Sequence, residues 1–274
     1  MMPRMSRLGQ TISCVALALA SSASGMLLAQ GQSPRDPRAA LPERPTVATH
    51  AHTVAPGFIE LEAGIQGLHA GAAGTEYDTP SLIKVGLASH LQLDVYEGVT
   101  AIRQTGQNAL GIGDISAGVK WRIFDGLPIV GDFALQSTVS LPTGSADKGT
   151  GTGTTGVNVL VISSNQLGPV SLDVNVGFSR RSGDQSVVPN QATLWTAAFS
   201  LPVRGRAGWA VEFFGFPGTT GPTGTRPIVG LTTGPMFALR RYLVLDCGAV
   251  FGLAGSQSTV LYGGVTWNIG RLPW

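Results

Sequence analysis

The chain has 274 residues, of which 43% are hydrophobic, only 12% are charged and 38 are glycine, and its formal net charge is +2. This length fits one large β domain, because all-β barrels run past the usual domain length without dividing. The mild charge, with no run of five basic residues, argues against a nucleic-acid partner, and so few charges are unusual for a soluble enzyme.

Residues 1–30 are expected to be a secretory signal peptide. Arg4 and Arg7 form a basic start, residues 12–20 are apolar, and small residues follow at 21–25. Cys14 would be lost with the signal, which leaves Cys247 alone and excludes an intramolecular disulfide. Beyond the signal no apolar stretch reaches eighteen residues, so a chain that spans a membrane would have to do so with strands.

Residues 31–57 are rich in proline and arginine. Such a composition buries little apolar surface and favours an extended chain. We therefore expect this stretch to be a periplasmic tail that precedes the folded domain.

From residue 58 to 274 the dominant pattern is alternation of apolar and polar residues in segments of about ten, the length that a tilted strand needs to cross a bilayer. The clearest example is 170–179, where Val170, Leu172 and Val174 interleave with polar residues. About twelve such strands are predicted, at 58–66, 79–87, 91–100, 112–123, 129–141, 157–165, 170–179, 191–202, 207–216, 228–239, 243–253 and 259–269.

The predicted connections alternate between long Gly/Thr-rich loops and tight turns, as in a barrel with long outer loops and short periplasmic turns. The sequence therefore predicts an all-β fold: a transmembrane antiparallel up-and-down β-barrel of about twelve strands in the bacterial outer membrane. A soluble periplasmic sandwich is the alternative fold.

Three places depart from the pattern. Pro235 lacks a donor inside a predicted strand, so Gly234 and Pro235 should form a bulge or divide the strand. Residues 159–162 lose the alternation, which leaves their lipid face unassigned. Trp274 is out of phase with the last strand, so that strand is expected to stop near Ile269.

Charged residues of the strands share the parity that faces the barrel interior. There they either line a solute path or pair across the lumen and close it. Glu60 and Glu62 belong to this set, and its candidate site residues are Lys84, Asp94, Asp114, Lys120, Arg122, Asp132, Asp173, Glu212 and Asp246. The pairs Arg180-Arg181 and Arg240-Arg241 fit solvated or headgroup-level charges, and binding of lipid phosphate is the more specific alternative.

No other motif predicts catalysis, a cofactor or a metal. Residues 151–156 match a dinucleotide fingerprint as a string but lie in a predicted loop with no helix after it. His50 and His52 lie in the tail without a carboxylate or cysteine cluster. A hydrolase carried by the barrel could use only His69 with Glu76 or Asp78 at the outer rim.

Four short motifs carry a family resemblance: Gly111–Ile115, Gly118–Trp121, Leu141–Gly144 and Asn175–Phe178. In this order, over residues 58–271, the chain resembles the outer-membrane transporters of the meta-pathway of phenol degradation. The resemblance implies a barrel of channel or transporter type and supplies no site residues.

We therefore expect an outer-membrane channel that passes small solutes, apolar or aromatic ones among them, passively through a narrow polar lumen. Its partners would be outer-membrane lipid and the solute. The alternatives are a closed structural or adhesive barrel that acts through its extracellular loops, and the barrel-borne hydrolase.

Overall fold

The computed structural model describes residues 36–69, 75–104, 107–182, 190–217, 227–255 and 259–273. All regular structure in these ranges is β. The strands are β1 Phe58–His69, β2 Thr75–Asp78, β3 Ser81–Ala88, β4 Leu91–Glu97, β5 Val99–Gln104, β6 Gln107–Ile112, β7 Ile115–Leu127, β8 Gly131–Leu141, β9 Gly156–Leu167, β10 Val170–Arg181, β11 Gln191–Arg204, β12 Ala207–Phe216, β13 Ile228–Arg240, β14 Leu243–Ala254 and β15 Val260–Arg271.

The strands form one antiparallel sheet that closes on itself. Each long strand pairs with its neighbour along the chain, and β15 returns to pair with β1 from Phe58↔Arg271 to Leu68↔Val260. The result is a closed barrel of 12 strands, which confirms the predicted fold class. Within the described ranges, no helix is long and apolar enough to cross a bilayer.

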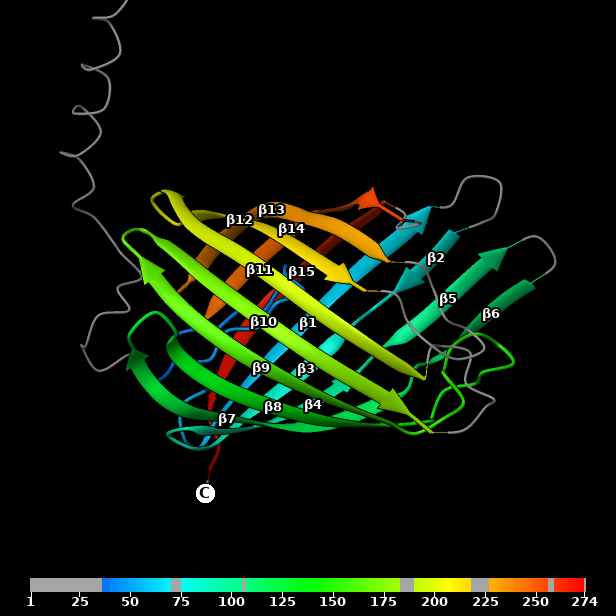
Figure 1. Ribbon diagram of the computed structural model, residues 1–274, viewed down its shortest axis with the longest axis horizontal. Coiled ribbons are helices and arrows are strands. Elements are labelled where there is room, and N and C mark those ends of the chain that lie inside the picture. The colour runs from blue at the N-terminus through cyan, green and yellow to red at the C-terminus, as the bar shows by residue number, and fades with distance from the viewer. Residues whose placement is uncertain are drawn as a thin grey trace, which may run out of the picture.

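The three short strands β2, β5 and β6 continue β3, β4 and β7 beyond a break in each. The breaks fall at 79–80, at Gly98 and at 113–114, and β2, β5 and β6 then pair with one another. Figure 1 shows β5 and β6 projecting past the ends of the other strands. The predicted loop around residues 101–111 is therefore mostly strand, because the hairpin continues past the wall.

The two ends of the barrel differ. Tight turns at 89–90, 128–130, 168–169, 205–206 and 241–242 gather at the end where β1 begins and β15 finishes, and the longer described loop 142–155 lies at the opposite end (Figure 1). In bacterial outer-membrane barrels the short turns face the periplasm. This assigns the end that carries Phe58 and Arg271 to the periplasmic side.

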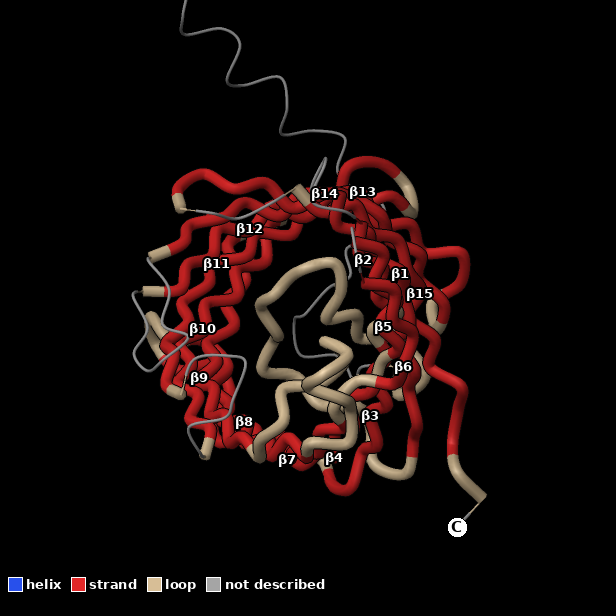
Figure 2. Tube along the Cα trace, turned by 90° about the vertical axis from the view of Figure 1, so that its right-hand side faces the viewer, coloured by secondary structure: helices blue, strands red, loops and turns tan. Residues whose placement is uncertain are grey.

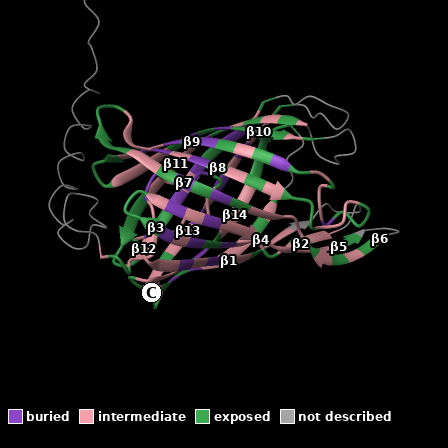
Figure 3. Cartoon of the chain, turned by 90° about the horizontal axis from the view of Figure 1, so that it is seen from below, coloured by how far each residue is buried: buried purple, intermediate pink, exposed green. Residues whose placement is uncertain are grey.

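Side chains alternate across the wall as the strand pleat requires. Buried and exposed positions follow one another along the strands (Figure 3). Exposed apolar residues such as Val174, Val176 and Phe178 face outward, whereas the buried positions of the wall are largely polar or charged. The wall therefore has an oily outside and a polar inside, as in a membrane barrel and opposite to a soluble protein.

Two of the three irregular places are resolved by the strand pairing. Strand β13 runs unbroken through Pro235 and keeps its register with β14 from Thr233↔Ala249 to Met236↔Asp246, so the predicted bulge or division is wrong. A side chain on Gly234 would come within 2.0 Å of the Cys247 carbonyl oxygen, so glycine permits this close approach. The last strand ends at Arg271, two residues beyond the expected Ile269, and Trp274 lies outside the described residues.

Residues 36–57 lie inside the barrel. We call them the luminal segment. The chain enters beside the turn at 241–242, where the Ala40 N–H donates to the Arg241 carbonyl. It then returns to the same end of the barrel, where β1 begins. Figure 2, which looks along the barrel, shows loop chain within the ring of strands. The sequence led us to expect a periplasmic tail here, but the described part of that tail lies in the lumen, because the wall offers its backbone polar partners.

Candidate functional site

The luminal segment has no helix or strand of its own. Away from water its backbone N–H groups must therefore find other acceptors. Side chains of the barrel wall supply them, from positions around the whole circumference. This binding of an irregular segment by the wall is the candidate functional site.

On one side of the lumen, Glu212 of β12 and Asn175 of β10 hold the segment. The Glu212 carboxylate accepts from the N–H groups of Val47 at 2.7 Å and Ala48 at 2.6 Å. The Asn175 amide accepts from the Thr49 N–H at 2.8 Å and donates to the Thr49 carbonyl at 2.9 Å. Asn175 thus satisfies both backbone groups of one residue, as a neighbouring strand would.

The next stretch rests on an apolar part of β9. Leu160 and Ile162 form a buried cluster with Ala51 and Ala134, while the Ala51 N–H donates to Ser164 Oγ at 2.8 Å. The sequence left the lipid face of 159–162 unassigned. In the structure Leu160 and Ile162 point inward, where the luminal segment covers them.

A charged cluster holds the start of the segment. Lys84 of β3 is fully buried, and its ammonium group lies 2.6 Å from Glu60 and 2.5 Å from Glu62. The remaining carboxylate lone pairs accept from the segment, with the Leu41 N–H at 2.9 Å from Glu60 and the Glu43 N–H at 2.9 Å from Glu62. The two carboxylates thus share one lysine and also accept hydrogen bonds from the backbone of the segment.

A second ion pair joins segment and wall. Lys120 of β7, also fully buried, bonds the Glu43 carboxylate, and it donates to Thr49 Oγ1 at 2.9 Å. Burial alone would raise the pKa of Glu43, but Lys120, Lys84 and His50 outweigh it and lower the pKa from 4.5 to about 2. Glu43 is therefore ionised while the segment is docked.

Arg44 contacts β14 and β15. Its guanidinium lies 3.4 Å from Asp246 of β14 and 3.4 Å from the Gly263 carbonyl. Side chains on Gly64 or Gly264 would come within 2.5 Å of this guanidinium, so the glycines of β1 and β15 make the room that Arg44 occupies.

These contacts leave the inward side chains of the wall covered. In an open water-filled lumen such residues would be exposed. Instead every strand of the closed wall has an inward residue at most 7% exposed, namely Glu60, Lys84, Asp94, Lys120, Ala134, Ile162, Asn175, Thr196, Glu212, Thr232, Asp246 and Thr266. Within the part of the chain that the structure describes, the barrel is filled at this level.

Most of the predicted lumen residues meet at this level, and two do not. Lys84, Lys120, Glu212 and Asp246 contact the segment as described above. Three others lie nearby: Asp94 accepts from Gln92 and Gln136, each at 2.7 Å, Asp173 accepts from Ser164 at 2.5 Å, and Asp132 lies 3.3 Å from His52.

Asp114 and Arg122 lie away from the luminal segment. Asp114 sits at the outer end, where it accepts from the N–H groups of Gly144 and Thr152 and so shapes the loop 142–155. Arg122 pairs with Asp125 at the periplasmic turn, at 3.1 Å. Both are therefore expected to shape the ends of the barrel.

Several contacts of the segment were not predicted. Gln92 accepts from the Val54 N–H at 2.7 Å, and Asn268 donates to the Pro37 and Ala39 carbonyls. These amides carry no charge, so the pattern of charged inward residues does not include them. The available signal was the lost alternation at 159–162, since an apolar residue that faces a polar lumen needs a cover.

The remaining motifs have local partners. His50 and His52 lie within the luminal segment, with ring centroids 5.3 Å apart, and in the described residues no group of three metal-binding side chains forms. The string 151–156 belongs to the loop before β9, which starts at Gly156 without an intervening helix. The side chain of His69 lies outside the described residues, and Asp78 accepts from Thr100 at 2.6 Å.

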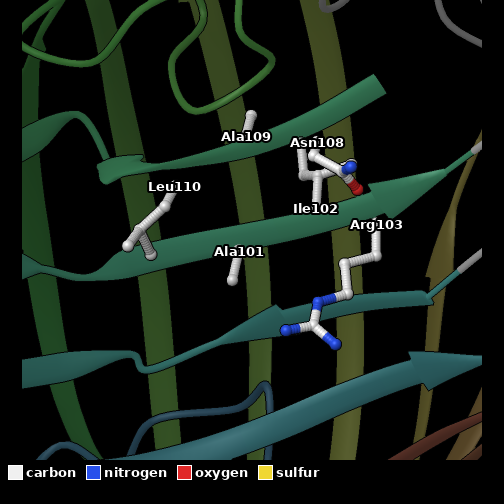
Figure 4. Close-up of a pocket in the computed structure, with 6 residues that line it drawn as sticks. All are labelled: Ala101, Ile102, Arg103, Asn108, Ala109 and Leu110. Carbon is white, nitrogen blue, oxygen red and sulfur yellow. The ribbon is translucent and has the colours of Figure 1, made fainter. Parts of the chain in front are cut away.

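Two open hollows lie at the outer end, away from the luminal segment. One, of about 710 Å³, is lined by residues of β5 and β6, including Ile102, Arg103 and Leu110 (Figure 4). The other, of about 540 Å³, is lined by Arg180, Arg181 and their neighbours. Both are open to the surface, and their lining residues do not belong to the luminal segment.

Solved barrels of the outer membrane have the same fold. The COG4313 outer membrane channel from Pseudomonas putida F1 superposes with a TM-score of 0.62 at 10% identity, over 79% of this chain and 97% of that chain. The NanC porin superposes with a TM-score of 0.51 at 8% identity, over 77% of this chain and 100% of that chain. At these identities the likeness concerns the fold alone, and no curated protein matches the sequence.

One family covers most of the sequence, which confirms the resemblance seen in the four short motifs. The match spans residues 43–263 and thus includes most of the luminal segment and the barrel up to the start of β15. This chain is an outer-membrane β-barrel that belongs to the family described as "Putative MetA-pathway of phenol degradation".

Proposed function

We propose that this protein is an outer-membrane channel for small solutes whose lumen is closed at rest by its own luminal segment. The observation that carries the proposal is the ring of buried inward residues, with one on every strand of the wall. A solute would cross only when the segment leaves at least part of this ring. The matched channel and porin folds support passage of solutes in general.

The way the segment is bound supports its displacement. It contributes no strand to the sheet and is held by side chains, by salt bridges and by the small apolar patch on β9. The wall pairs completely without it. Release of the segment would therefore leave every strand of the wall hydrogen-bonded to its neighbours and would expose a polar lumen to water.

The family description points to the solutes to be tried first. It refers to phenol degradation, so phenol-sized aromatic compounds are the first class to test. The exposed lumen would carry more carboxylates than ammonium groups, with Glu60, Glu62, Asp94, Asp132, Asp173, Glu212 and Asp246 against Lys84 and Lys120. Small neutral or cationic solutes should therefore pass more readily than anions.

The test compares the mature chain with a variant that lacks residues 31–54, each in planar bilayers. The intact protein should conduct rarely, and the truncated barrel should conduct steadily and pass small solutes. A truncated barrel that is folded yet silent would contradict the proposal.

That silent outcome would favour the second candidate, a closed structural or adhesive barrel. The specific observation in its favour is the ordered outer loop 142–155, which Asp114 fixes through Gly144 and Thr152. This function predicts no conductance with or without the segment. It predicts a loss of surface binding or envelope integrity when the loop is removed.

A further inference from the structure

A group of arginines lies at the periplasmic end of the barrel, near the turn at 241–242 where the luminal segment enters. Arg204 ends β11, Arg206 lies in the following turn and Arg240 ends β13; we call these three the arginine rim. All three side chains are exposed. Within the described residues, no carboxylate lies within ion-pair distance of any of them, whereas the neighbouring Arg241 pairs with Asp36 at 3.2 Å.

Two of these guanidinium groups donate to the same backbone carbonyl oxygen. Arg206 donates to the Leu239 carbonyl at 3.0 Å, and Arg240 donates to the same oxygen at 2.9 Å. One carbonyl oxygen thus brings together two like charges from adjacent hairpins. Their repulsion is not offset by an acidic side chain, so this arrangement favours an anion that binds both.

Backbone irregularities turn two of the arginines toward the lipid. The β11–β12 register shifts between Pro202 and Arg204, which places Arg204 opposite Ala207, on the parity of Trp209. The β13–β14 register shifts between Ala238 and Arg240. Without these shifts both arginines would have the inward parity of their strands.

The second shift has the same effect on Arg240. It places Arg240 opposite Leu243, which shares the parity of the exposed Leu245 and Cys247. Arg240 therefore faces the outside of the barrel. Arg204 and Arg240 thus lie on the lipid-facing side of two neighbouring hairpins.

The residues just above the rim mark the edge of the bilayer. Trp209 and Phe237 face outward and are 40% and 45% exposed, and the Trp209 indole N–H is satisfied by Thr233 Oγ1 at 2.8 Å. Aromatic side chains of this kind sit at the headgroup level of membrane barrels. The arginine rim therefore lies at the depth of the lipid phosphates of the periplasmic leaflet.

We propose that the arginine rim is a binding site for the phosphate group of an anionic phospholipid. The planar guanidinium matches phosphate oxygens with two parallel hydrogen bonds, which a lysine could not do. The acyl chains would then lie along the outward surface of Trp209 and Phe237. This site is independent of any passage through the lumen.

The test is native mass spectrometry of the intact mature protein, released from micelles that hold equal amounts of phosphatidylglycerol and phosphatidylcholine. The protein should retain phosphatidylglycerol preferentially. The double variant Arg204→Gln/Arg240→Gln should retain it about thirtyfold less, from ~1 kcal/mol per arginine near a charged membrane surface. The matched control Arg103→Gln/Arg180→Gln, which removes two exposed arginines from the outer end, should bind as the parent does.

Further measurements separate the alternatives. Arg204→Lys/Arg240→Lys keeps the charge and should retain an intermediate amount of lipid, which also serves if the glutamine variant folds poorly. Inorganic phosphate should not displace the lipid. Equal retention by the rim variant and the outer control would overturn the proposal, and so would displacement by inorganic phosphate, which would indicate a site for the free anion.

Discussion

The pair of Lys120 and Glu43 offers the sharpest test of how the luminal segment is held. Lys120→Met keeps most of the side-chain volume but removes the ammonium group, which contacts Glu43, Thr49 Oγ1 and the His50 carbonyl. The Glu43 carboxylate would then remain buried without this cation. Removing one partner of a buried pair costs about 3–5 kcal/mol.

That cost falls on the docked state alone, because a released segment exposes Glu43 to water. Since 1.4 kcal/mol is a factor of ten, the released population should rise between about 100-fold and a few thousandfold. The assay is the fraction of time that single channels are open in a planar bilayer. Lys148→Met, the same change in the outer loop 142–155, should leave this fraction unchanged.

A second substitution checks the cause. Glu43→Met in the Lys120→Met background replaces the buried ion pair by two apolar side chains, an exchange that is often neutral for stability. The double variant should therefore close again. If Lys120→Met stays closed in a barrel that still migrates as a folded band without boiling, the ion pair does not hold the segment and the reasoning fails.

Three further predictions follow from the docked segment. Gly86→Ala should raise the open fraction, because its Cβ would lie 2.1 Å from the Ala55 carbonyl oxygen of the luminal segment. The control Gly263→Ala should leave the open fraction unchanged, because its Cβ would lie 3.7 Å from the nearest atom. Equal conductance of the two variants would count against the docking geometry. Because docking lowers the pKa of Glu43 from 4.5 to about 2, its contribution to docking is complete above pH ~4.5 and is lost as the pH falls toward 2. Conductance measured against pH should stay low from neutrality to pH ~5, and opening already near pH 6 would implicate the histidines instead. The variant without residues 31–54 should prefer cations in reversal-potential measurements, since seven lumen carboxylates then face two lysines; an anion preference would contradict this account.

The barrel could be predicted from the sequence because one physical constraint acts on every strand. Lipid outside and polar groups inside impose a period of two, which Val170, Leu172 and Val174 display directly. The breaks at Gly98 and at 113–114 were harder to predict from the sequence. Strands β5 and β6 lie beyond these breaks, and their alternation of apolar and polar residues is weak.

The luminal segment could not be predicted because its backbone, more than its side chains, is what the wall recognises. Val47, Ala48 and Thr49 are bound through their N–H groups, which every residue except proline carries. Composition alone therefore indicates an extended tail in water. Likewise the inward parity of Glu212 was predictable, but its use as an acceptor for two backbone donors depends on the fold.

The central claim is that solutes pass only when the luminal segment leaves the wall, and a reversible lock tests it most directly. Ala51→Cys and Ser164→Cys, in a chain with Cys247→Ser, place two thiols where the Ala51 N–H now meets Ser164 Oγ at 2.8 Å. Single-channel recording before and after reduction measures the effect of the disulfide. We expect the oxidised channel to stay closed and the reduced channel to open at least as often as the Cys247→Ser parent, since a thiol is a weaker acceptor than the Ser164 hydroxyl. Openings of equal frequency and size in the oxidised and reduced protein would contradict the claim.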